Sequence, residues 1–128
     1  MKDDKNNSSL TVRAIRGATT TNRNSEEEIE LAVLELIKEL IQKNNLNSQS
    51  IISITFSVTS DINACFPASI VRNSLKMKEV ALIDCQQMYV KNDIQKCIRI
   101  LAHVLMPSNI KIYHPYLRNA SSLRPDRS

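Results

Sequence analysis

Residues 25–45, SEEEIELAVLELIKELIQKNN, predict one long amphipathic helix. Ser25 is followed three residues later by Glu28, the capping-box pattern that satisfies free amides at a helix start. Asn44-Asn45 ends the helix. The apolar side chains recur at helical spacing: Ile29, Val33, Leu36, Ile37, Leu40 and Ile41. A helix with a single apolar face needs another layer to cover that face, and a sheet is the expected layer here.

The segment after this helix predicts a strand. Ile52, Ile54, Phe56 and Val58 alternate with serine and threonine, which is the period of a half-buried strand. Pro67 opens a short helix with an apolar side. Weaker patterns predict three more strands, at 10–18 (broken by Gly17), at 80–83 (ending at Asp84-Cys85) and at 110–117.

Residues 96–106 fit two periods, and periodicity alone leaves the choice open. The apolar residues fit a helix through Ile98, Leu101, Ala102 and Leu105, and they fit a strand through every second residue from Ile98 to Met106. In a strand, Arg99 shares a face with Leu101, His103 and Leu105. Five candidate strands and one long helix predict an α+β fold in which the helix covers one sheet face. The other face also needs burying, so we expect an oligomer.

Length and composition exclude several classes of protein. A chain of 128 residues with 42% hydrophobic and 23% charged residues is typical of one globular domain, here 10–128 after a flexible polar extension at 1–9. The extension lacks the features of a secretion signal or a transit peptide. No apolar run is long enough for a membrane span. The single glycine excludes a glycine-rich phosphate loop.

The charge balance favours a small anionic ligand. The net charge is +4 and the isoelectric point about 9.1. Aromatic residues make up only 4%, and no basic run exceeds two residues, so a nucleic-acid surface is not expected. Instead, arginines stand at the ends of predicted elements: Arg16, Arg72, Arg99 and Arg124. A guanidinium binds carboxylates through two parallel hydrogen bonds and stays charged, so these positions suggest discrete anion sites.

The cysteines and histidines predict neither a disulfide scaffold nor a metal site. Cys65, Cys85 and Cys97 are odd in number and form no C-x-x-C pair. His103 and His114 are far apart, with no carboxylate at ligand spacing. We therefore expect free thiols in a reducing, cytoplasmic compartment and no metal. A buried, inert thiol is the favoured interpretation of Cys85, and no catalytic nucleophile is evident.

Five segments carry a resemblance to a known family: RAIRGATT at 13–20, DINACFPA at 61–68 followed by Arg72, KCIR at 96–99, Tyr116-Leu117, and LRPD at 123–126. Their order and spacing resemble the monofunctional AroH class of chorismate mutases. The resemblance implies a mixed five-stranded sheet packed on a helix and assigns 96–106 as a strand. It also implies a homotrimer, a trimeric pseudo α/β-barrel with active sites in clefts between subunits.

The reaction that the resemblance implies is the Claisen rearrangement of chorismate to prephenate, on the route to phenylalanine and tyrosine. This reaction is unimolecular and needs no cofactor, metal or nucleophile. By resemblance, Arg99 is the cation beside the breaking C–O bond and Arg16 is a second deep arginine. Tyr116 bonds a substrate carboxylate, and Phe66 and Ala68 form an apolar wall. The remaining substrate-binding positions are Arg72, Ile83, Leu123 and Arg124.

Two positions depart from the family pattern. Ser69 stands where the family usually has a lysine, so one cation at the rim is missing. Gln87 stands where the family usually has a glutamate that accepts a hydrogen bond from the substrate hydroxyl and helps orient the arginines. Our hypothesis is that Asp84, three residues earlier, supplies the carboxylate, while Gln87 bonds the hydroxyl through its amide. Asp84 as a solvated acid at a strand end is the simpler interpretation.

Two other functions remain as alternatives. A catalytically weak relative would bind a small dicarboxylate as a regulatory module, which the departures at Gln87 and Ser69 suggest. A basic interaction module would bind nucleic acid or another protein, with a steep dependence on salt. Only the isoelectric point favours this second alternative.

Overall fold

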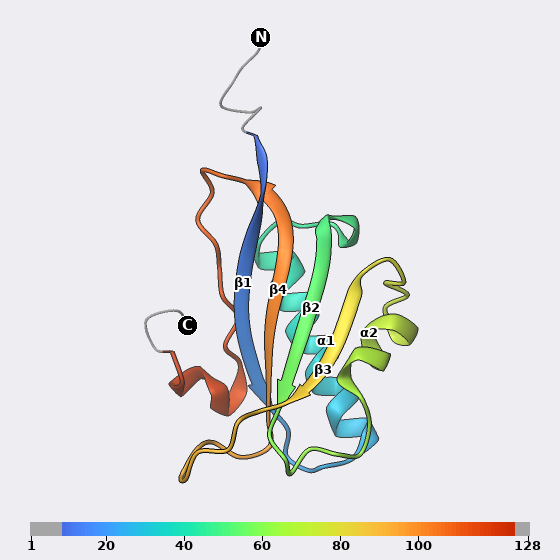
Figure 1. Ribbon diagram of the computed structural model, residues 1–128, viewed down its shortest axis with the longest axis vertical. Helices are drawn as coiled ribbons and strands as arrows, with labels where there is room; N and C mark the ends of the chain where they lie inside the picture. The colour runs from blue at the N-terminus through green and yellow to red at the C-terminus, as the bar shows by residue number, and fades with distance from the viewer. Residues whose placement is uncertain (1–8, 125–128) are drawn as a thin grey trace.

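The structure is a computed structural model and describes residues 9–124. Within that range the chain forms an α+β fold with a mixed four-stranded sheet in the order β1-β4-β2-β3 (Figure 1). The strands are β1 (Leu10–Thr20), β2 (Ile51–Val58), β3 (Ala81–Gln86) and β4 (Cys97–Pro107). The helices are α1 (Glu26–Lys43) and α2 (Pro67–Ser74), with short 3-10 helices η2 (Ser48–Ser50) and η3 (Arg118–Ser122).

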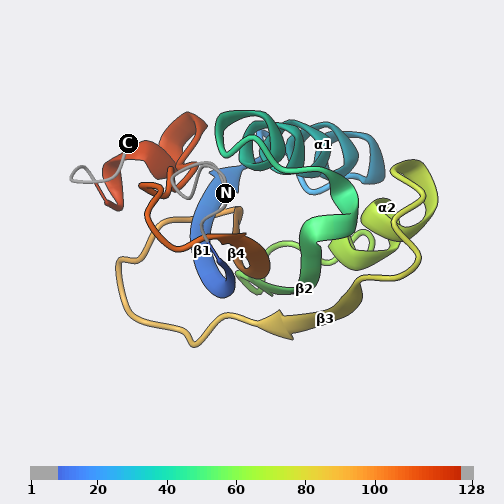
Figure 2. The ribbon, with the colours of Figure 1, turned by 90° about the horizontal axis from the view of Figure 1, so that it is seen from above.

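Both α-helices lie on the same face of the sheet (Figure 2). The side chain of Ser25 accepts a hydrogen bond from the Glu28 amide at 3.2 Å, so the predicted start of α1 is confirmed. The apolar face of α1 is buried through Ile29, Ala32, Val33, Leu36, Ile37 and Leu40. The predicted short helix beginning at Pro67 is also confirmed, as α2.

Residues 97–107 form a strand, and β4 lies in the interior of the sheet. It pairs antiparallel with β1 on one side and with β2 on the other. Every second side chain from Ile98 to Met106 is buried under the helices, while Arg99, Leu101, His103 and Leu105 occupy the opposite face. The strand alternative for 96–106 was therefore correct, because both neighbours supply hydrogen bonds that a helix there would forgo.

The phase of β2 differs from the prediction at its first residues. Ile54 and Phe56 are fully buried as expected, but Ile51 is buried and Ile52 is exposed. The register against β4 shifts between Ile51 and Ser53, so Ile52 is the extra residue of an irregularity. Such a bulge reverses the direction of the side chains that precede it.

The prediction of a fifth strand at 110–117 is wrong, because these residues do not join the sheet as a hydrogen-bonded strand. The described residues show only one isolated bridge there, between Ala18 and Tyr116. The amide of Arg16 donates to the imidazole Nδ1 of His114 instead of to a backbone carbonyl. Pro115 has no N–H to donate, although its carbonyl accepts from the Ala18 amide at 2.9 Å. The ladder therefore cannot extend along this edge.

The sheet face opposite the helices is open in the single chain (Figure 2). It carries exposed apolar side chains on three strands, namely Val12, Ile83, Leu101 and Leu105.

The amino-terminal residues 1–8 and the carboxyl-terminal residues 125–128, including Pro125-Asp126 of the LRPD segment, lie outside the described residues.

The backbone of Gly17 packs closely against the segment that carries Tyr116. A Cβ atom on Gly17 would lie 2.6 Å from the Pro115 carbonyl oxygen and 3.0 Å from Pro115 Cγ. Because the nearer atom is backbone, this segment would have to move away from β1. Glycine is therefore required here by close approach.

We predict that Gly17→Ala destabilises the fold by about 1–3 kcal/mol, the usual cost of overpacking. Thermal melting at a fixed protein concentration measures the loss. Ala14→Gly, at an exposed position of the same strand, is the control and should cost about 0.5–1 kcal/mol. A loss for Gly17→Ala no larger than that of the control would show that the segment yields without cost.

Candidate functional site

One pocket gathers five of the predicted site residues beside β1. It has a volume of about 150 Å³, and Gly17 and Ile100 contribute to its wall. The predicted residues that line it are Arg16, Arg99, Tyr116, Leu123 and Arg124. Strands β1 and β4 supply the two arginines that the resemblance places deep in the site, although Arg16 is exposed and Arg99 half-buried in the single chain. The segment after β4 supplies the other three residues. We refer to it as the arginine pocket.

The arginine pocket is held together by contacts between β1 and residues 114–117. The amide of Leu117 donates to the Ala18 carbonyl at 2.9 Å, which fixes the backbone beside the buried Tyr116. The amide of Arg16 donates to His114 Nδ1 at 3.0 Å. Ala18, Cys97, Tyr116 and Ala120 form a small apolar cluster of their own, with Leu123 packed against it. Backbone hydrogen bonds and the small apolar cluster therefore hold the two sides of the arginine pocket in place.

Arg99 is held at one end of its guanidinium. Its Nη2 donates to both carboxylate oxygens of Asp93 at 3.2 Å. Its Nε is buried and has no hydrogen-bond partner among the described residues. An unpaired buried donor is costly, even on a side chain that is otherwise partly exposed. The part of Arg99 that lines the pocket adds a positive charge to its wall.

The thiol of Cys97 lies next to this arginine and is buried. Burial raises the pKa of Cys97, although the adjacent guanidinium of Arg99 lowers it in part. Burial also raises the pKa of Cys65, and the charges of Glu26, Glu30 and Asp84 raise it further. Both thiols therefore stay protonated at neutral pH, which makes them poor nucleophiles. The predicted burial of Cys85 is wrong: this thiol is exposed, because it lies on the edge strand β3.

A second pocket lies beside β3 and α2. Its volume is about 690 Å³, and its lining includes Phe66, Ser69 and Asp84. The Phe66 side chain is 70% exposed, which is unusual for a large aromatic residue in a single chain. Ala68 is buried at the start of α2, and Arg72 follows one turn later. We refer to it as the aromatic pocket.

Asp84 stabilises the start of α2 from the neighbouring strand. Phe66 offers no side-chain cap to the helix, and Asp84 Oδ1 accepts a hydrogen bond from the Ala68 amide at 3.0 Å. Desolvation by burial raises the pKa of the Asp84 carboxyl, while the bond from Ala68 and the charge of Arg72 partly oppose that rise. Ile83 points to the opposite face of β3 and is 57% exposed.

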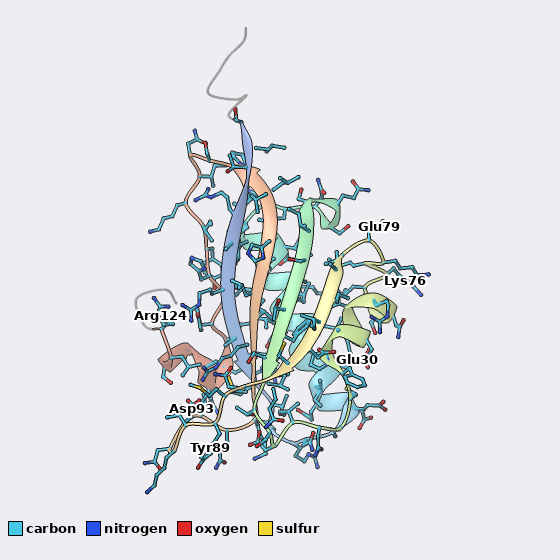
Figure 3. The ribbon with its side chains drawn as sticks, viewed as in Figure 1. Glu30, Lys76, Glu79, Tyr89, Asp93 and Arg124 are labelled. Carbon is cyan, nitrogen blue, oxygen red and sulfur yellow. The ribbon has the colours of Figure 1, made fainter. Side chains whose placement is uncertain are left out.

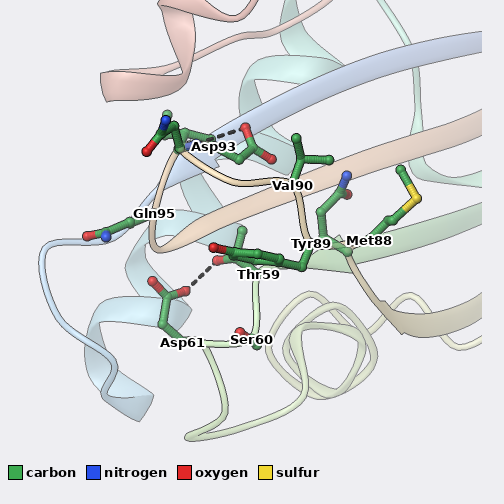
Figure 4. A pocket seen from close by; sticks show the side chains of 11 residues that line it. Thr59, Ser60, Asp61, Met88, Tyr89, Val90, Asp93 and Gln95 are labelled. Atoms are coloured by element: carbon green, nitrogen blue, oxygen red, sulfur yellow. Dashed lines mark hydrogen bonds between the residues drawn. The ribbon is translucent and has the colours of Figure 1, made fainter.

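Gln87 lies in neither of these pockets. Its side-chain Oε1 accepts a hydrogen bond from the Ser57 hydroxyl at 2.5 Å. Its backbone amide donates to the Val58 carbonyl at 2.7 Å. It lines a third, polar pocket of about 340 Å³ under residues 87–96, which Tyr89, Val90 and Asp93 also line (Figure 4). The oxygen of the side-chain amide that was predicted to bond a substrate hydroxyl is therefore already engaged by Ser57.

The predicted site residues are therefore divided within one chain. The arginine pocket lies along β1 and the aromatic pocket along β3, and these are the two edge strands of the sheet (Figure 1). Asp93, the ion-pair partner of Arg99, was not among the residues predicted from the sequence. The only signal for it was an acidic residue six positions before Arg99, in a loop with no periodicity.

Residues 9–124 contain no group of three or more histidine, cysteine, aspartate or glutamate side chains that could hold a metal ion. In the same range, none of the helices is both long and apolar enough to span a membrane.

Comparisons with known proteins agree on one family. Residues 12–127 match the family model described as chorismate mutase type I. The chain is 36% identical over 121 residues to chorismate mutase AroH of Bacillus subtilis, covering 93% of this chain and 94% of the relative. It is 34% identical over 118 residues to chorismate mutase AroH of Thermus thermophilus, covering 90% and 95%.

A solved structure extends the likeness to the fold. The chorismate mutase from Clostridium thermocellum superimposes with a TM-score of 0.79 at 39% sequence identity, covering 86% of this chain and 98% of that one. The resemblance inferred from the five sequence segments is confirmed. The chain belongs to the chorismate mutase type I family.

Proposed function

We propose that this chain is an isomerase that rearranges chorismate to prephenate, at a site that two copies of the chain complete together. Its family membership supports the reaction. The observation that carries the proposed site is the division of the arginine and aromatic pockets between opposite edges of one sheet. Neither pocket alone offers both the cations and the apolar wall that the substrate requires.

The chemistry explains why cations and shape suffice. Chorismate is a flexible dianion that reacts within itself, so the protein must hold it in the compact conformer from which the new C–C bond forms. Negative charge develops on the ether oxygen as the C–O bond breaks. A fixed guanidinium beside that oxygen stabilises the transition state more than the ground state. We assign this contact to Arg99, with Arg16 and Tyr116 binding carboxylate oxygens.

We propose a homotrimer closed head to tail. In such a ring the arginine pocket of each copy meets the aromatic pocket of the next, and every site is the same. The open apolar face of the sheet gives the copies a reason to associate, because Val12, Leu101 and Leu105 would leave water. Arg72, Leu123 and Arg124 would border the mouth of the combined cleft, and Ile83 would face the neighbouring copy.

The substrate hydroxyl needs an acceptor in this arrangement, and we assign it to Asp84. One oxygen of Asp84 is engaged by the Ala68 amide, and no hydrogen bond to the other is present among the described residues. Gln87 then supports the site from beside β2, through Ser57. We place the reaction in the cytoplasm, as a step toward phenylalanine and tyrosine, where the three free thiols would remain reduced.

We predict that Arg99→Ala lowers kcat by a factor on the order of 10²–10³ or more, by analogy with the removal of an oxyanion donor. The assay follows the loss of the chorismate diene absorbance and identifies prephenate as the product. Arg23→Ala removes an exposed arginine outside the three pockets and is the control. An assembled parent protein that binds a dicarboxylate transition-state analogue without turnover would favour the regulatory alternative.

A mixing experiment tests whether two copies share each site. Arg99→Ala damages the arginine pocket and Phe66→Asp damages the aromatic pocket. Co-assembly of the two variants in equal amounts should restore about a quarter of the parental activity, because that share of random neighbours joins two intact halves. Mixing Arg99→Ala with Arg16→Ala should restore nothing, since both damage the same half. No recovery in the first mixture would place the whole site within one chain.

The proposed acceptor predicts a pH dependence. Asp84→Asn keeps an oxygen for the Ala68 amide but loses the charge, so kcat/KM at neutral pH should fall about tenfold or more. Because the pKa of Asp84 is raised, kcat/KM of the parent should begin to decline in acid above the ordinary aspartate value of about 4. The Asp84→Asn variant should lack this decline. A neutral-pH loss of less than about threefold would remove Asp84 from the reaction.

The same group has a second, independent readout in stability. A raised pKa means that the folded chain binds the Asp84 proton more tightly than the unfolded chain does. The parent should therefore lose stability relative to Asp84→Asn as the pH rises from the ordinary to the raised pKa. Melting temperatures across that range measure the difference. A parallel course for the two proteins would mean that burial does not perturb the carboxyl.

A further inference from the structure

We propose that Asp93 is a positioning residue for Arg99, which fixes the guanidinium at its Nη2 end and so orients the rest of the group toward the arginine pocket. This inference rests on the proposed function of Arg99. It assigns a role to the carboxylate of Asp93, which was not predicted from the sequence.

The ion pair between the two side chains is partly buried. Arg99 Nη2 lies 3.2 Å from both oxygens of Asp93, and the side chains are only 28% and 26% exposed. The other ion pair in the described part of the chain, Arg118 with Glu35, has a carboxylate that is 50% exposed. Partial burial weakens screening by solvent, so the Asp93 contact restrains Arg99 more than a surface pair would.

Asp93 is itself held in place by its own loop. Its Oδ1 accepts a hydrogen bond from the Ile94 amide at 2.8 Å, and its amide donates to the Val90 carbonyl at 3.1 Å. The loop is fixed at both ends. The amide of Gln87 donates to the Val58 carbonyl, and the amide of Lys96 donates to Asp61 Oδ2 at 2.9 Å. A fixed carboxylate can orient a long, flexible side chain, whereas a mobile one cannot.

The contact with Asp93 occupies only one of the three nitrogens of the guanidinium. Asp93 engages a single guanidinium nitrogen instead of the two that a bidentate pair would take. The buried Nε has no partner among the described residues. Arg99 lines the arginine pocket, whereas Asp93 lines the polar pocket beneath the loop (Figure 4). The ion pair thus joins a residue that lines the arginine pocket to a residue that lines the polar pocket.

Among the described residues, Asp93 is the only carboxylate that forms an ion pair with this guanidinium. Gln87 is neutral, and its amide oxygen accepts from Ser57. Asp84 lies in the aromatic pocket and accepts from the Ala68 amide. Asp93 therefore supplies the charged contact that orients Arg99, and the Cys97 thiol is a second, uncharged neighbour of the guanidinium.

The test is a double-mutant cycle built on Asp93→Asn and Arg99→Gln. The side-chain amide introduced by Asp93→Asn keeps an oxygen for the Ile94 amide, so this substitution removes the charge while leaving the loop contact available. Each protein is assayed for kcat and KM with chorismate and for the Kd of a bicyclic dicarboxylate transition-state analogue. Melting temperature and size-exclusion chromatography establish that each variant folds and assembles. Asp93→Ser supplies a second neutral acceptor if the Asp93→Asn variant does not assemble.

We expect Asp93→Asn to lower kcat about ten- to a hundredfold with KM within about threefold of the parent, because a misoriented cation fails mainly in the transition state. Asp93→Glu should recover part of the loss. In the Arg99→Gln background, Asp93→Asn should change kcat and Kd less than about twofold, because the two residues act as a unit. Glu79→Gln removes the same charge from an exposed loop at the other end of the sheet and should have no effect (Figure 3).

Three outcomes would overturn the proposal. Equal losses in both backgrounds would mean that Asp93 only supports its loop. A lower KM or tighter Kd with kcat unchanged would make Asp93 a competitor of the substrate for Arg99. No change in any constant would mean that the ion pair is incidental. If the parent itself lacks turnover, the proposed function fails, and the Kd cycle alone then decides whether Asp93 positions Arg99 for an anion.

Discussion

The double pairing of β4 is the constraint on which the rest of the structure depends. Its register with β1 runs without interruption from Leu10 opposite Pro107 to Thr20 opposite Cys97, and β2 pairs along its other side. Because side chains alternate along a strand, burying Ile98 and Ile100 under the helices sends Arg99 to the open face. A slip of one residue would place a guanidinium in the core, at a cost that no available partner could offset. The packing of the core therefore fixes where the positive charge lies.

The same sheet explains why function and assembly are coupled in the proposed site. The arginine pocket follows the edge strand β1 and the aromatic pocket follows the edge strand β3, so no bending within one chain would bring them together. Association of copies would cover the apolar face and join the pockets in one event. Stability would then depend on protein concentration, and substrate binding across the junction would favour the assembled form.

Features set by neighbouring residues in the sequence could be predicted, and features set by contacts between distant segments could not. Alternation in 96–106 gave the faces of β4 once a strand was assigned, and the capping pattern at Ser25 gave the start of α1. The exposed Ile52 was not predictable, because a bulge is set by the partner strand. The strand expected at 110–117 failed because His114 and Pro115 occupy the edge of β1 without forming a ladder. The resemblance supplied the site residues, but their division between two pockets is a property of the fold alone.

Two acidic side chains near the proposed site, neither of which lines the arginine pocket, already accept hydrogen bonds from the protein. Asp84 accepts from the Ala68 amide, and Asp93 accepts from the Ile94 amide and from Arg99. Each is therefore partly neutralised by donors of the protein before any substrate arrives. A carboxylate held in this way adds direction to a neighbouring cation or helix while contributing little opposing field. Gln87, whose side chain accepts from Ser57, is neutral, so this region carries one negative charge fewer than it would with a glutamate at that position. In the proposed cleft, Asp93 would orient Arg99, and each of the two carboxylates would already accept a hydrogen bond from the protein.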